Sequence, residues 1–145
     1  MTFRPLAAIF VVVGLASASA LAQTNLGELL DMGGKKLSRQ EAVDSLSGAT
    51  LSGETREGAV FQTEYKADGT YAGSFVSPQN KRNGSTFGKW TVDDSGKVCI
   101  DGIVRLYQVR PQQSCVFYFR GGDQYYTSAS DADRAAPVSK RAIKK

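Results

Sequence analysis

The spacing of hydrophobic residues changes from helical to alternating near Gly48. Two earlier segments, residues 25–32 and 38–46, each place leucine and other apolar residues on one face. Each begins with a capping residue followed three positions later by Glu, which is typical of a helix N-terminus, and each stops at glycine. We therefore predict two short helices within residues 23–48, stabilised by packing because isolated helices of this length are unstable in water.

After Gly48, short runs of β-branched and aromatic residues are separated by clusters of Gly, Pro, Asn and Asp. These runs predict strands, and no helix lies between them, so the strands are expected to pair antiparallel in a meander. The predicted strands are residues 59–65, 70–76, 86–93, 97–101, 103–109, 115–120 and 124–128, with 110–113 as a turn. About seven or eight strands favour a small closed barrel, or a small sandwich, because either removes exposed edges.

The barrel is expected to occupy residues 49–130. Residues 131–145 are polar and basic and are assigned as a C-terminal tail, in which Val138 offers at most a last edge strand.

The first 22 residues have the pattern of a secretory signal peptide. Arg4 gives a basic start, residues 6–15 are apolar, and small residues lead to a cleavage site between Ala22 and Gln23. The apolar run is too short for a transmembrane anchor, which needs about 20 apolar residues. We predict export, with a periplasmic or secreted mature protein.

The composition fits one ordinary domain: the chain has 145 residues and a formal net charge of +4. Its basic residues are scattered, so no nucleic-acid partner is expected. Cys99 and Cys115 are the only cysteines. In an oxidising compartment such a pair is expected to form a disulfide, whose ring of about 17 residues corresponds to about 3 kcal/mol of stabilisation. A redox or metal-binding thiol pair is the alternative.

Recognisable catalytic chemistry is missing from the sequence. The chain contains no histidine, which excludes Ser-His-Asp and Cys-His arrangements and histidine metal sites. No Cys-x-x-Cys or phosphate-binding glycine loop occurs, so no cofactor, metal site or catalytic residue is assigned. The carboxylates that an acid–base pair would need, Asp68, Asp93, Asp94, Asp101 and Asp123, lie nearly all in predicted turns, where aspartate has a backbone role.

Two features indicate a binding surface. Gly88 and Trp90 form a Gly-x-Trp element, which occurs in lipocalin-like barrels with the tryptophan closing one end. The simpler interpretation of this single tryptophan is a large core anchor. Aromatic residues also gather late in the chain, so we assign Trp90, Tyr118, Tyr125 and Tyr126 as the candidate binding surface.

Strand alternation places Phe117 and Phe119 on the opposite face from Tyr118. One of these aromatic sets is then exposed, as a ligand mouth or partner surface, or else helices cover it. The sequence leaves both interpretations open.

The order of several short motifs resembles a family of small exported bacterial proteins catalogued as a domain of unknown function. The motifs are Leu29-Leu30, Gly33-Gly34-Lys35-Lys36-Leu37, Leu46-Ser-Gly48-Ala-Thr-Leu51-Ser-Gly53, Tyr65-Lys-Ala-Asp68-Gly69-Thr70, Gly88-Lys-Trp90-Thr-Val92-Asp-Asp94, Gly96-Lys-Val-Cys99, Cys115 and Asp123-Gln-Tyr125-Tyr126. The resemblance covers nearly the whole chain after residue 22. It implies a lipocalin-like β-barrel and export, and no activity.

A partial resemblance links Gly88, Trp90 and Cys99 to periplasmic metalloprotease inhibitors, which are small barrels with one disulfide. This chain places the element late, behind predicted strands and two helices.

Two functional hypotheses follow. The first is a non-enzymatic exported barrel that binds a small apolar ligand or an envelope component in its mouth. The second is a protein-partner role, such as hydrolase or protease inhibition or envelope maintenance, with the polar loop Ser77–Ser85 as the contact. An enzyme is the least favoured class.

Overall fold

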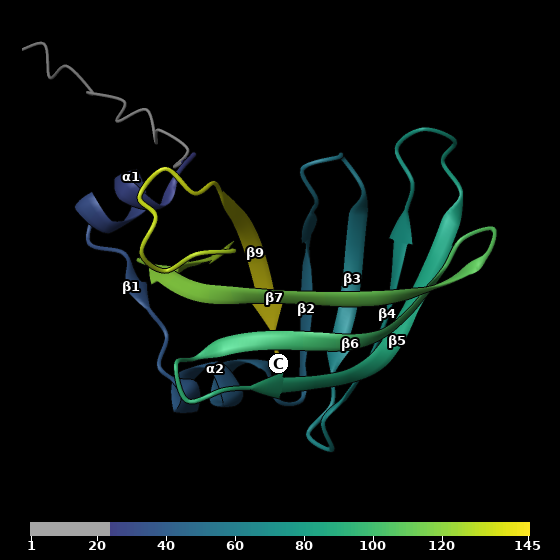
Figure 1. Cartoon of the computed structure of the whole chain (residues 1–145), viewed down its shortest axis with the longest axis horizontal. Coiled ribbons are helices and arrows are strands. Elements are labelled where there is room, and N and C mark those ends of the chain that lie inside the picture. Colours follow the sequence, from purple (N-terminus) through teal and green to yellow (C-terminus); the bar gives the residue numbers. More distant parts are fainter. Residues whose placement is uncertain (1–23) are drawn as a thin grey trace, which may run out of the picture.

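Eight antiparallel strands close into a barrel in the computed structural model, which describes residues 24–145 (Figure 1). The barrel strands are β2 (Ala49–Glu54), β3 (Val60–Tyr65), β4 (Thr70–Val76), β5 (Asn83–Val92), β6 (Lys97–Arg105), β7 (Val109–Gly121), β8 (Gln124–Ser128) and β9 (Val138–Lys144). Each strand pairs with its neighbour in the chain, and β2 pairs with β9 to close the barrel. The prediction of an antiparallel barrel behind two short helices is confirmed. The predicted signal peptide and its cleavage site lie outside the described residues.

Helix α2 (Arg39–Leu46) packs against one end of the barrel (Figure 1). Its N-terminus carries the predicted capping box: the N–H of Glu41 donates to Ser38 Oγ at 3.2 Å, and the N–H of Ser38 donates to the Glu41 carboxylate at 2.8 Å. The hydrogen bonds from Ser38 hold the pKa of Glu41 below its usual range. Leu46 is fully buried in the barrel core, so the amphipathic helix closes this end.

Helix α1 (Leu26–Asp31) packs on the outer wall of the barrel. Leu26 and Leu29 form a cluster with Phe117 and Phe119, which point outward from β7. All four side chains are buried. The outward aromatic set is therefore covered by a helix and does not form an exposed surface.

A single strand of two residues lies between the two helices and pairs with the barrel. Strand β1 (Lys35–Lys36) pairs with β7 at Arg120 and Phe119, beyond the last β7 residue that pairs with β6. Strand β1 thus pairs with the part of β7 that extends beyond the end of β6.

Two strand boundaries in the middle of the chain differ from the prediction. Strand β6 runs through Gly102 without a break, and the turn to β7 lies at residues 106–108, not at 110–113. Pro111, which indicates a turn in the sequence, lies inside β7 and pairs with Ile103. Pro111 and Cys115 are four residues apart on β7, so their pairs with β6 are of the same hydrogen-bonding type. The Cα atoms of Cys115 and its partner Cys99 are only 4.1 Å apart. Such a narrow pair is not hydrogen-bonded, so the Pro111 nitrogen faces away from β6 and no ladder bond is lost.

The C-terminal boundary of the barrel also differs. Residues 131–145 are predicted as a tail, but β9 lies within them and pairs with both β2 and β8. Strand β2, which the sequence does not predict, is its partner. Both strands alternate small or polar residues with a few apolar ones, and this gives only a weak strand signal until the two are seen paired.

The backbones of β5 and β6 lie very close together where Gly88 of β5 pairs with Gly102 of β6. A Cβ atom on Gly88 would lie 2.2 Å from the Asp101 carbonyl oxygen, and one on Gly102 would lie 2.2 Å from the Phe87 carbonyl oxygen. Only glycine fits such a close backbone approach. The glycine of the Gly-x-Trp element therefore has a structural role, because it allows β5 and β6 to approach this closely.

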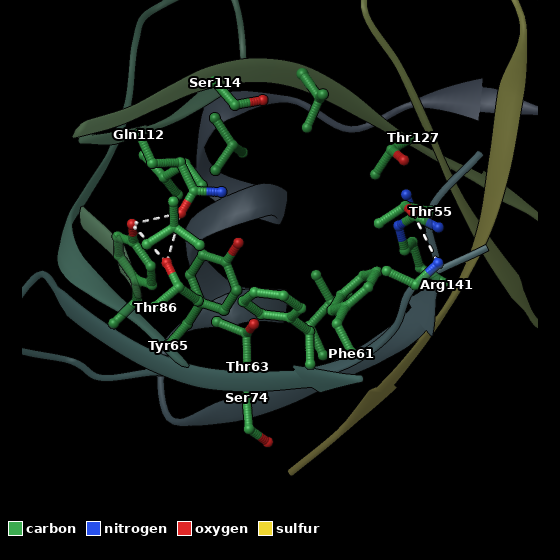
Figure 2. A pocket seen from close by; sticks show the side chains of 18 of the residues that line it. Thr55, Phe61, Thr63, Tyr65, Ser74, Thr86, Gln112, Ser114, Thr127 and Arg141 are labelled. Atoms are coloured by element: carbon green, nitrogen blue, oxygen red, sulfur yellow. Dashed lines mark hydrogen bonds between the residues drawn. The ribbon is translucent and has the colours of Figure 1, made fainter. Parts of the chain in front are cut away.

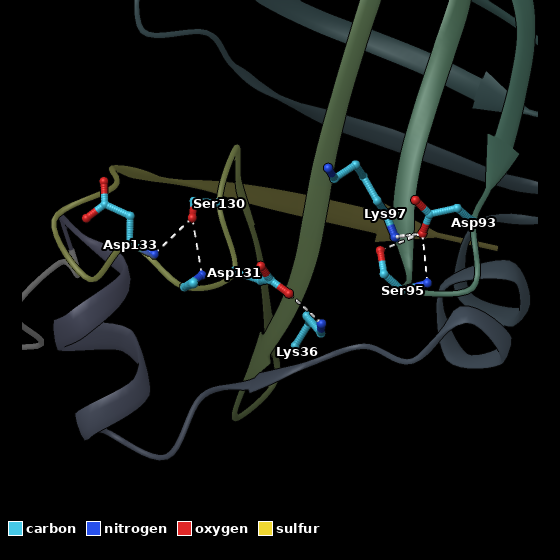
Figure 3. A network of polar contacts seen from close by, with 8 residues as sticks. Lys36, Asp93, Ser95, Lys97, Ser130, Asp131 and Asp133 are labelled. Carbon is cyan, nitrogen blue, oxygen red and sulfur yellow. Dashed lines mark hydrogen bonds and ion pairs between the residues drawn. The ribbon is translucent and has the colours of Figure 1, made fainter.

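Short polar networks fix the turns and hold the C-terminal segment to the barrel (Figure 3). In the turn between β5 and β6, Asp93 Oδ1 accepts hydrogen bonds from the Ser95 hydroxyl and from the N–H groups of Lys97 and Ser95, and these bonds lower the pKa of the carboxyl. Lys36 forms an ion pair with Asp131 at 2.7 Å. Asp93 therefore has the backbone role that the sequence predicts.

Candidate functional site

The interior of the barrel contains a cavity of about 380 Å³. This volume falls at the lower end of the range for small-molecule pockets. Its wall is mainly apolar and aromatic and includes Leu51, Phe61, Tyr65, Phe75, Ile100 and Val104. Because side chains alternate along each strand, these residues belong to the inward face, and the cavity lies within the lumen.

The floor of the cavity is closed by Trp90 and the residues around it. The indole N–H of Trp90 donates to the Lys66 carbonyl oxygen at 2.9 Å, and its ring meets Tyr65 edge-on with centroids 5.5 Å apart. Trp90 is only 7% exposed and packs with Leu46 of α2. Trp90 does not itself line the cavity, so it acts as the core anchor of this end.

A hydrogen-bonded cluster occupies one side of the lumen. The hydroxyl groups of Tyr71 and Thr86 both donate to Gln112 Oε1, the Tyr71 bond being 3.5 Å long. The three side chains come from β4, β5 and β7, which curve around this side (Figure 2). The cluster offers hydroxyl and amide groups to a ligand within a largely apolar wall.

Two tyrosines lie deep in the lumen beside this floor. Tyr118 is 2% exposed, and Tyr65 is also buried. Burial raises the pKa of both phenols, and a hydrogen bond from Tyr118 partly offsets this effect at Tyr65. Both hydroxyl groups therefore stay neutral well beyond physiological pH and can act as hydrogen-bonding groups.

Arg141 of β9 lies on the side of the lumen opposite Gln112 and Thr86 (Figure 2). Its guanidinium sits over the Phe61 ring at 5.1 Å, and Nη1 donates to the carbonyl oxygens of Glu54 at 3.0 Å and Lys140 at 2.9 Å. Burial lowers its pKa, but arginine stays charged at any pH at which the protein works. The lumen therefore carries a fixed positive charge on its wall.

The four residues of the predicted binding surface lie in different places. Tyr118 lines the cavity, whereas Trp90 lies beneath it. Tyr125 is half-buried and packs against the inner core, with Arg120 over its ring at 5.9 Å. Tyr126 is buried in the outer cluster under α1. The structure thus does not bring these four side chains together on one surface.

Cys99 and Cys115 form a disulfide between β6 and β7. The two residues face each other in the strand register, next to the inward pair Ile100 and Ser114. They therefore point outward, away from the cavity, and the predicted structural bridge is present.

Sequence reasoning missed two polar residues of the cavity lining, Arg141 and Gln112. Arg141 belongs to the segment predicted as a basic tail, and Gln112 to the segment predicted as a turn. The one available signal was the alternation of Ser139, Arg141 and Ile143 with the residues between them. A strand of that pattern would place one arginine on its inward face.

The described residues show no arrangement for metal binding. Within residues 24–145, no group of three or more His, Cys, Asp or Glu side chains is placed to hold an ion. Asp68 accepts hydrogen bonds from Thr70 in the turn before β4, as its sequence context predicts. Asp101 differs, because it lies exposed within β6.

No helix within residues 24–145 has the length and hydrophobicity needed to span a membrane. Comparisons of the chain with models of protein families, with curated proteins and with solved structures find no match. The functional interpretation therefore depends on the barrel and its cavity.

Proposed function

We propose that this protein is a non-enzymatic binding protein that holds a small, predominantly apolar molecule inside its barrel. The observation that carries the proposal is the cavity of about 380 Å³, lined by aromatic and aliphatic side chains and closed at one end by Trp90 and α2. A few convergent polar groups in an apolar pocket are typical of sites that orient one ligand. The lipocalin-like resemblance agrees with this role and stays a prediction.

Export of the protein is part of the same proposal. The Cys99–Cys115 disulfide supports it, because disulfides persist mainly in oxidising compartments. The signal-like pattern of the first 22 residues points the same way. A periplasmic or secreted barrel would then bind a molecule of the cell envelope or its surroundings.

A protein-partner role is the second candidate. Within residues 24–145, the β7 segment 109–116 pairs with β6 alone, so its other edge is free for an added strand. The predicted contact loop is less available, since Asn80 hydrogen-bonds with Tyr107 and Arg82 sits over the Tyr107 ring at 5.0 Å. Cross-linking that captures a stable partner through residues 109–116, with an unoccupied lumen, would favour this role.

The binding proposal is tested with N-phenyl-1-naphthylamine, an uncharged probe whose fluorescence rises in apolar sites. Ser114 points into the lumen, and the adjacent Gln113 points outward on the same strand. We expect saturable binding by the wild-type protein, about tenfold or greater weakening by Ser114→Phe, and no change with Gln113→Phe. Absence of saturable binding by the wild-type protein, or equal weakening by both variants, would contradict binding in the lumen.

A further inference from the structure

We propose that the ligand of the lumen is a small anionic amphiphile, with an apolar body and one acidic headgroup such as a carboxylate, and that Arg141 binds the headgroup. Because the headgroup site is part of the same cavity, this rests on the proposed function.

The hydrogen-bonding capacity of Arg141 is only partly used. A guanidinium has five N–H donors, on Nε, Nη1 and Nη2. Both hydrogen bonds that Arg141 makes to the backbone come from Nη1. Within residues 24–145, Nε and Nη2 donate to no protein acceptor and no carboxylate forms an ion pair with this side chain. These donors form the planar arrangement that binds a carboxylate through two parallel hydrogen bonds.

The position of the charge favours an anion over water alone. Arg141 is half-buried and lies on the wall of a mainly apolar cavity. Partial removal of a cation from water is unfavourable unless an opposite charge or hydrogen-bond acceptors compensate for it. An acidic group in the lumen would supply both, in a setting where charge-assisted hydrogen bonds are stronger than in water.

The surroundings of Arg141 fit an apolar body attached to that headgroup. The Phe61 ring lies under the guanidinium, and Phe61, Thr63 and Tyr65 line the wall between Arg141 and the Gln112 side of the cavity (Figure 2). A ligand with its acidic end at Arg141 would lay its body along this wall. A ligand with charges at both ends is not favoured, because the Tyr71–Thr86–Gln112 cluster is neutral.

The charged residues near the open end of the barrel also favour an anionic ligand. The β2–β3, β4–β5 and β6–β7 loops, with the strand ends beside them, carry five cations, Arg56, Lys81, Arg82, Arg105 and Arg110. The same segments carry two acids, Glu54 and Glu57. A net positive rim attracts anions toward the lumen and raises their rate of association.

The experiment compares octanoate with octanol, its uncharged counterpart, by isothermal titration calorimetry on the purified protein. Arg141→Met keeps an apolar stem over Phe61 and removes the charge. Arg120→Met is the matched control: Arg120 also packs over an aromatic ring and donates to a backbone carbonyl, but it is exposed and lies outside the cavity lining.

The wild-type protein and the Arg120→Met variant are expected to bind octanoate at least about tenfold more tightly than octanol, about 1.4 kcal/mol. Arg141→Met should remove this preference, so that octanoate and octanol bind this variant with similar affinity. If the wild-type protein binds the two compounds equally, or Arg141→Met keeps the preference, the headgroup assignment is overturned and the apolar binding site stands. If neither compound binds, the proposed function fails as well. Even if Arg141→Met does not fold, equal binding of the two compounds by the wild-type protein overturns the headgroup assignment.

Discussion

The disulfide gives the most direct prediction of stability. Cys99 and Cys115 are separated by 16 positions, and a bridge that closes a loop of this size restricts the unfolded chain by about 3 kcal/mol. Both side chains lie on the outer face of the barrel, away from the inner core, so a serine at either position creates no cavity in that core. Cys99→Ser, Cys115→Ser and the double variant should therefore each lower the free energy of unfolding by the same amount, about 3 kcal/mol.

Urea denaturation followed by the fluorescence of Trp90, the only tryptophan, measures this loss. In thermal unfolding it corresponds to a decrease in melting temperature of about 10 °C for a domain of this size. Unequal losses in the two single variants, or a double variant as stable as the wild-type protein, would refute a bridge that acts through the unfolded chain. A larger loss in the double variant than in either single variant would show that the cysteines contribute separately.

Two further predictions concern packing and ionisation. Leu29→Ala should lower the free energy of unfolding by about 2–5 kcal/mol, since this side chain is 1% exposed in the cluster under α1. Met32→Ala, at a 65% exposed position, should change the free energy of unfolding by less than about 0.5 kcal/mol. Equal effects of the two variants in urea denaturation would contradict the docking of α1. The free energy of unfolding should fall as the pH rises above about 10, because the phenols of Tyr118 and Tyr65 ionise there in the unfolded chain while burial keeps their folded pKa higher. Tyr118→Phe should make this decline shallower between about pH 9 and pH 11, and an unchanged slope would rule out a contribution from Tyr118.

Local signals in the sequence predicted the helices because each signal has a direct structural cause. Asn25 and Ser38 cap the two helices with their side chains, as their spacing to a following Glu indicates. Turn residues such as Asp68 likewise bind their own backbone. Pro111 misled the prediction because its effect depends on which side of the strand its nitrogen faces. Strand register sets that side, and a single sequence does not reveal it.

The site was less predictable than the fold, for the same reason. Trp90 is recognisable as an anchor from its size alone. Tyr125 and Tyr126 adjoin in the sequence, yet they lie against the inner core and in the outer cluster, respectively. Because Arg141 is charged and lies among other basic residues, its segment was predicted to be a solvated tail. Only the pairing of β9 with β2 brings the Arg141 side chain to the lumen. Composition gives the kinds of side chain in the site, and closure of the barrel selects which of them meet.

The pairing of the first barrel strand with the last one sets an order of events in folding. Residues 50–53 of β2 pair with residues 141–144 of β9, about 90 positions away, and contacts this distant form slowly because a long stretch of chain must first be ordered. The ribosome must make residue 144 before this pairing is complete, so an emerging chain stays open through most of its synthesis. Arg141 lies on the strand that makes the final pairing. A fragment that lacks β9 therefore lacks both the pairing that closes the barrel and the charge of Arg141. The proposed binding site is complete only when the last strand has joined the barrel.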